Sequence, residues 1–258
     1  MILRALELKP SNDVSIKPIW TEIERTQQQD FSHGCWLIPQ PAHAALSGDI
    51  AARLDPQIFS GVTPELQKSF ALHDSGWSLL DGSAIQDSRS RGSSCRPLSF
   101  MLAEPADIID AWSGSIAIAG KASPIGGYLV SRHFSSIAAL EPEQPTKRGR
   151  LLSTFITSER VRQQKLRQKL RQTDAVLDRL LQALQFCDLL SLYISCGVTA
   201  NVEFPQEVEG NRMKLVSTNG ATTITPTPFM EPTEFAVSAI RHPRSKQSST
   251  GSFTLCLQ

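Results

Sequence analysis

The chain has few cysteines, and none of them follow the spacing that a disulfide framework or a zinc knuckle would need. It contains five cysteines in 258 residues, and no two of them form a Cys-x-x-Cys pair. An odd number without such a pair argues against both kinds of site. We therefore expect reduced, structural cysteines at Cys35, Cys95, Cys187, Cys196 and Cys256.

The chain also lacks a long apolar run and a strong excess of charge. No stretch approaches the roughly 20 residues of a membrane-spanning helix, and residues 1–8 lack the hydrophobic core and cleavage site of a signal peptide. We therefore expect a cytoplasmic protein without a membrane partner. The net charge of +1 favours no class of charged partner, and 40% hydrophobic residues allow a substantial core.

One segment, residues 158–193, has helical periodicity and a basic first half. Its cationic side chains are Arg160, Arg162, Lys165, Arg167, Lys169 and Arg171. No aromatic residue is interleaved with these charges, and the whole chain is nearly neutral. We therefore expect a solvated helix face here, and no nucleic-acid partner.

Local signals elsewhere predict a helical middle of the chain. One helix is expected over about 41–54, and a second begins at Thr63 and Pro64, where threonine can cap and proline suits the first helical position. Two shorter helices are expected near 107–112 and 124–140. The intervening segment rich in serine, glycine and arginine, 81–97, is predicted to be a loop.

The doublet His73-Asp74 lies in a segment whose periodicity predicts a buried helix. Leu66, Phe70 and His73 have the three-to-four-residue spacing of one helix face, and Trp77 continues that face. An imidazole in an apolar stripe needs a polar partner. The doublet therefore offers two candidate metal ligands side by side.

Two other histidines and one more aspartate occupy similar positions. His43 is in register with the apolar face of the helix expected over 41–54, and His133 with that of the helix expected over 124–140. Asp188 replaces a leucine in a stripe of leucines at strict helical spacing. Carboxylates are almost never fully buried unless they are paired or bind a metal.

A single inward histidine is usually a core residue bonded to a backbone carbonyl. Taken together, however, the three imidazoles and two carboxylates form a donor set that suits a divalent transition metal such as iron, manganese or zinc. The sequence therefore predicts a site for one or two such ions, with the ligands His43, His73, Asp74, His133 and Asp188.

The order of these residues resembles the HD superfamily, the helical metal-dependent phosphohydrolases named after the His-Asp doublet. His43 matches the first histidine of that family, His73-Asp74 matches the doublet, and Asp188 matches the last aspartate. Several segments are also similar to an uncharacterised bacterial family within the superfamily, namely residues 36–48, 73–77, 96–100, 131–133, 188–192 and 226–229.

The resemblance implies a mainly α fold, an HD-like helical bundle. Residues 41–196 would form the helical metal-binding domain, and residues 1–40 would add short strands and an insertion packed on it. After Cys196 the alternating pattern and the turn residues predict a small β appendage over 197–258, within the same globular unit.

The same resemblance implies an enzyme that hydrolyses a phosphoester, such as a nucleotide, with a metal-activated water. Asp74 would bridge a second metal, and His133 would either ligate that metal or protonate the leaving group. Arg132 or Lys121 would steady a small anionic substrate. The sequence leaves the oligomeric state open, a homodimer included.

One residue departs from the family pattern. Many HD phosphohydrolases carry a lysine three residues after the aspartate of the doublet, where it can hold a phosphate, but this chain has Trp77. An indole offers an apolar face and one N–H donor, which suits an organic ligand better than a phosphate. Two alternatives therefore stay open, a di-iron oxygenase of HD fold and a non-catalytic HD body that binds a ligand.

Overall fold

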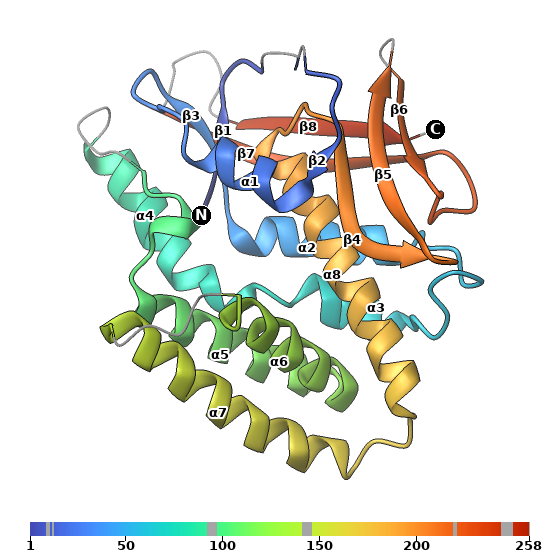
Figure 1. Ribbon diagram of the computed structural model, residues 1–258. Coiled ribbons are helices and arrows are strands. Elements are labelled where there is room, and N and C mark those ends of the chain that lie inside the picture. The colour runs from blue at the N-terminus through green and yellow to red at the C-terminus, as the bar shows by residue number, and fades with distance from the viewer. Residues whose placement is uncertain are drawn as a thin grey trace.

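The computed structural model combines one mixed sheet with two layers of helices (Figure 1), and it describes residues 1–8, 11, 13–91, 97–140, 146–218, 221–243 and 250–257. The strands are β1 (Ile2–Ala5), β2 (Lys17–Pro18), β3 (Cys35–Ile38), β4 (Val202–Val208), β5 (Asn211–Thr218), β6 (Ala221–Thr225), β7 (Thr233–His242) and β8 (Thr250–Leu257). The α-helices are α1 (Ile19–Gln27), α2 (Gln40–Ala51), α3 (Pro64–Ala71), α4 (Ser78–Arg91), α5 (Pro105–Ala122), α6 (Pro124–Ala138), α7 (Lys147–Arg167) and α8 (Asp174–Cys196). Two short 3-10 helices complete the set, η1 (Ser75–Trp77) and η3 (Phe100–Leu102).

The sheet has the strand order β1-β3-β7-β8-β6-β5-β4-β2. Neighbouring strands are antiparallel except for β2 with β4 and β6 with β8. Along β7 the side chains alternate between buried and exposed, which is the pattern of a sheet with one face on the core. Helices α2 and α8 pack against the sheet, and α5, α6 and α7 lie on the far side of these helices (Figure 1).

The prediction of a mainly α bundle with a small C-terminal β appendage is wrong. Strands from both ends of the chain form one eight-stranded sheet, because β3 pairs with β7 and β2 pairs with β4. β1 and β3 have four residues each and β2 has two, so they are too short to show an alternating pattern. β2 and β3 pair with strands about 200 residues away, β4 and β7, which local periodicity cannot reveal.

One hydrophobic core runs from the sheet through the helices. It includes Ile2 of β1, Leu184 of α8 and Phe235 of β7, each at most 2% exposed. It continues to Trp112 of α5. Residues from 1–40, 41–196 and 197–258 therefore share a single core, and α8 crosses its centre (Figure 1).

Several of the predicted helices are present. α2 covers most of 41–54, and α3 begins where expected, with the Thr63 hydroxyl accepting a hydrogen bond from the backbone N–H of Leu66. α5 and α6 include the segments expected near 107–112 and 124–140. Among the described residues, no helix has the length and apolar character needed to span a membrane.

Two other local predictions are wrong. The segment 81–97 does not form a loop, because α4 extends to Arg91; residues 92–96, which include Cys95 and Arg96, lie outside the described residues. The helix was missed because its serines, glycine and charges leave no apolar stripe. The pattern over 158–193 belongs to two helices, α7 and α8, and not to one. As expected, the basic residues of this segment lie largely exposed.

The His73-Asp74 doublet lies in a turn and not within the predicted helix. α3 ends at Ala71, and the turn leads directly into η1. Gly76 allows η1 to lie directly on α5, because a Cβ at this position would be 1.9 Å from the carbonyl oxygen of Ala111. The position of the doublet therefore depends on a close backbone contact that only glycine permits.

We predict that Gly76→Ala destabilises the protein by about 3 kcal/mol, at the upper end for overpacked sites, because the methyl group would force η1 away from α5. Gly82→Ala in α4 is the matched control, since a Cβ there meets nothing within 4 Å. It should instead stabilise the protein by about 0.5–1 kcal/mol. Urea unfolding measures both values, and equal effects would contradict the packing of η1 on α5.

Candidate metal centre

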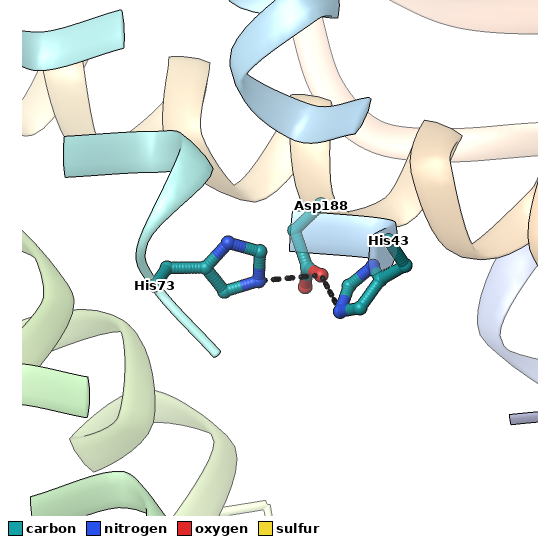
Figure 2. Close-up of side chains that lie close together, drawn as sticks. All are labelled: His43, His73 and Asp188. Atoms are coloured by element: carbon teal, nitrogen blue, oxygen red, sulfur yellow. Dashed lines mark hydrogen bonds and ion pairs between the residues drawn. The ribbon is translucent and has the colours of Figure 1, made fainter. Parts of the chain in front are cut away.

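Four separate elements bring polar side chains together beneath the sheet. His43 comes from α2, the doublet from the turn after α3, His133 from α6 and Asp188 from the middle of α8. Each of these side chains is buried in the core. Figure 2 shows the imidazoles of His43 and His73 approaching the carboxylate of Asp188 from opposite sides.

The centre of the cluster has the spacing of a metal site. Ligand atoms of His43, His73 and Asp188 all lie within 4.8 Å of one another. The Nε2 atom of His73 is 3.2 Å from Oδ1 of Asp188, and Nε2 of His43 is 3.8 Å from the same oxygen. A buried group of two imidazoles and one carboxylate in this arrangement could hold a metal ion.

The other two predicted ligands lie at the edge of this group. Oδ2 of Asp74 is 2.8 Å from Nε2 of His43 and 3.6 Å from Nε2 of His73. Nε2 of His133 is 3.5 Å from Oδ2 of Asp188, whereas the hydrogen bond of His73 is to Oδ1 of the same carboxylate. The structure therefore brings all five sequence-predicted ligands together.

Hydrogen bonds outside the cluster orient both central imidazoles. Nδ1–H of His73 donates to the carbonyl oxygen of Phe70 at 2.8 Å. The Ser191 hydroxyl donates to the carbonyl oxygen of Asp188 at 2.8 Å, so it accepts from Nδ1–H of His43, also at 2.8 Å. When either ring is neutral, its Nε2 lone pair therefore faces the cluster, as metal binding requires.

The electrostatic environment of the cluster favours cationic groups. Burial lowers the pKa of His73, but the carboxylates of Asp74 and Asp188 outweigh burial and raise this pKa to about 9. Burial raises the pKa of Asp188, but the hydrogen bond from His73 and the nearby imidazoles outweigh it and lower this pKa to about 2. The ionised carboxylate of Asp188 beside imidazole nitrogens fits a divalent cation, which would replace the proton on His73.

His133 differs from His73 because desolvation dominates. Burial lowers the pKa of His133 to about 4, although Asp188 opposes this effect. Its Nδ1 atom and Oδ1 of Asp74 are both buried and have no hydrogen-bond partner. Both atoms are therefore available to a ligand at this end of the cluster.

The structure does not bring the proposed anion-binding residues to the cluster. Arg132 forms an ion pair with Asp178 at 2.8 Å, where both side chains are accessible to solvent. Lys121 is exposed at the end of α5. Neither residue lines the pocket beside the cluster.

A pocket of about 320 Å³ opens next to the cluster. Four of the five candidate ligands line it, namely His43, Asp74, His133 and Asp188. The rest of its lining is largely aromatic and aliphatic, with Gln40, Glu24 and Arg148 as further polar residues. A concave, mostly apolar site with a few convergent polar groups is typical of small-molecule binding.

Sequence reasoning missed the residues that support the cluster. Ser191 orients His43, and Ser47 bonds the Ser191 hydroxyl at 2.9 Å. A signal existed, because Ser191 lies three residues after Asp188, on the helix face that carries it. The pocket gave no such signal, since its residues come from six α-helices, two 3-10 helices and the turns next to them.

Comparison with known protein families identifies the family of this chain. The family model DUF3891, described as a protein of unknown function, matches residues 27–242. The chain belongs to the DUF3891 family. All five candidate ligands of this DUF3891 protein lie within the matched segment. Searches of curated proteins and of solved structures gave no match.

We predict that Ser191→Ala weakens zinc or manganese binding by about 10–100-fold, because it removes the acceptor that orients His43. Ser195→Ala is the matched control. Ser195 lies one turn further along α8, and its hydroxyl is buried without a hydrogen-bond partner. Calorimetric titration of metal into each variant should show normal affinity for Ser195→Ala; equal affinities in both variants would contradict the role of Ser191 in this DUF3891 chain.

Proposed function

We propose that the protein is a metal-dependent hydrolase that cleaves a phosphoester of a small organic molecule. One observation carries the proposal: His43, His73 and Asp188 form a buried cluster of metal-binding spacing beside a pocket of ligand size. Hydrogen bonds from Nδ1–H of each central imidazole direct Nε2 toward the carboxylates, where a metal would take the place of a proton between Nε2 and the carboxylate. This arrangement supports metal chemistry on a bound small molecule.

The protein side chains have distinct roles in the proposed reaction. When bound, a divalent metal lowers the pKa of a coordinated water from 15.7 to about 7 and polarises a phosphoryl oxygen. His43, His73 and Asp188 would hold the metal. Asp74, whose Oδ1 has no hydrogen-bond partner, would accept the proton that the attacking water gives up.

The second oxygen of Asp188 favours a site for a further ion. Oδ1 of Asp188 lies against His73 and Oδ2 lies against His133, so one carboxylate can serve two ions. His133 would supply a further protein ligand of the second ion, and Asp74 would keep its role as proton acceptor. This assignment makes His133 a ligand and leaves the leaving group to be protonated by solvent.

The choice of a phosphoester rests on the ordered resemblance to the HD superfamily, because the description of DUF3891 as a protein of unknown function points to no substrate. With Trp77 in the position of the family lysine, charge compensation for the phosphate would come mainly from the metal. Arg148 lines the pocket and adds one cation. The proposed substrate is a phosphate monoester or diester of a small organic group, whose charge the metal and Arg148 would balance.

An oxygenase is the second candidate, and a specific observation favours it. Two histidines and one carboxylate are the protein ligands of non-haem iron(II) oxygenases. His43, His73 and Asp188 have this composition. The apolar pocket would suit oxidation of an organic substrate as well as hydrolysis.

We predict that protein loaded with manganese, iron or zinc hydrolyses bis(4-nitrophenyl) phosphate or 4-nitrophenyl phosphate, and that EDTA abolishes the activity. His73→Ala should lower kcat/KM by at least about 100-fold, because it removes both a ligand and the metal that acidifies water. His33→Ala is the control, since His33 is exposed and outside the cluster. Release of 4-nitrophenolate measures the rates.

An oxygen electrode separates the two candidates. Oxygen uptake by the iron(II) protein with an organic alcohol, without phosphoester hydrolysis, would replace the hydrolase with the oxygenase. Metal binding that is lost in His73→Ala, with turnover in neither assay, would instead indicate a non-catalytic ligand-binding protein. Unchanged metal content in His73→Ala would contradict the site itself.

A further inference from the structure

Three of the four tryptophans of the chain line the pocket beside the metal cluster. They are Trp20 of α1, Trp77 of η1 and Trp112 of α5. Trp77 and Trp112 are at most 9% exposed, whereas Trp20 is 39% exposed. The two buried indoles therefore belong to the inner part of the pocket, and Trp20 lies at its mouth.

The inner lining of the pocket includes a pair of stacked aromatic rings. Trp112 stacks on Phe134 with ring centroids 5.1 Å apart and an interplanar angle of 16°. Ile108 and Leu192 are buried beside this pair in the pocket lining. Stacked rings present a rigid surface that favours other flat groups, because offset aromatic pairs gain energy beyond the burial of area.

Buried polar atoms without a partner are concentrated at this pocket. Within the described part of the chain, seven buried side-chain polar atoms have no hydrogen-bond partner, and four of them belong to pocket-lining residues. These four are Oε1 of Gln40, Oδ1 of Asp74, Nε1 of Trp77 and Nδ1 of His133. Such atoms usually have partners in a native protein, so their concentration here points to a ligand that supplies them.

The indole of Trp77 is the most specific of these groups. An indole N–H can only donate, so its partner must be an acceptor of the ligand. The carbonyl oxygen of the Gln40 side chain is only an acceptor, so it calls for a ligand donor. A hydroxyl or phenolic group on a flat ring offers both an acceptor and a donor.

We propose that the pocket binds a flat aromatic group that carries an oxygen acceptor, and that Trp77 Nε1–H donates to this oxygen. The inference deepens the proposed function, because it names the organic part of the substrate on which the metal centre acts. Trp77 determines specificity through its N–H, and the stacked pair of Trp112 and Phe134 determines it through shape.

The test uses 1-naphthol as the probe, with cyclohexanol as a hydroxyl compound that is not flat. Both are titrated calorimetrically into the full chain in the presence of EDTA, so that the hydroxyl cannot bind a metal. We expect 1-naphthol to bind with one-to-one stoichiometry and at least ten-fold more tightly than cyclohexanol. Absence of binding, or equal affinities, overturns the proposal.

Two substitutions measure separately how the N–H of Trp77 and the ring of Trp112 contribute to binding of 1-naphthol. Trp77→Phe keeps a ring but removes the N–H, and should weaken 1-naphthol binding about five-fold. Trp112→Leu removes the indole of the stacked pair. It should weaken the binding of 1-naphthol about five-fold while leaving the binding of cyclohexanol unchanged. Trp36→Phe is the control, since Trp36 lies on β3, where its ring contacts Phe253 of the sheet. Thermal unfolding checks that each variant is folded, and equal affinities in Trp77→Phe and Trp36→Phe overturn the role of Trp77.

The outcome of this binding test can be distinguished from the outcome of the hydrolase assay. 1-Naphthol carries no phosphate, so its binding does not require phosphoester hydrolysis. Binding of 1-naphthol without hydrolysis of any phosphoester would overturn the proposed function alone. Hydrolysis of methyl phosphate by a protein that does not bind 1-naphthol would overturn the aromatic pocket alone.

Discussion

The buried carboxylate of Asp188 is the constraint on which the site depends. It is 6% exposed, and an ionised carboxylate at this depth is costly unless positive charge lies beside it. Its two oxygens face different imidazoles, those of His73 and His133. Protons on the imidazoles satisfy the carboxylate in part, and a divalent cation shared with the Nε2 atoms would satisfy all of these groups together.

The architecture holds this carboxylate still. α8, which carries Asp188, lies between the sheet and the outer helices and packs against both (Figure 1). The doublet reaches it because α3 stops at Ala71 and Gly76 lets the following turn lie against α5. The same packing leaves a pocket on the open side of the cluster, where the outer helices supply aromatic walls. The buried His-Asp cluster and the pocket are thus consequences of one arrangement of helices.

The sequence indicated which polar side chains lie together better than it indicated the fold. His43, His133 and Asp188 were predicted because each interrupts an apolar stripe of its own helix, and a stripe is a local signal. The turn at His73 was missed because helical spacing continues for a few residues past the end of α3. The sheet was missed because the pairing of β3 with β7 joins segments about 200 residues apart. The aromatic pocket was missed for the same reason, since its walls meet only in the folded chain.

The central claim is that His43, His73 and Asp188 hold a divalent metal. Anomalous diffraction from crystals grown with manganese or iron tests it most directly. The account predicts a peak at about 2.0–2.2 Å from Nε2 of both histidines and from a carboxylate oxygen of Asp188. An ordered site without an anomalous peak, or a peak only at other residues, would contradict it.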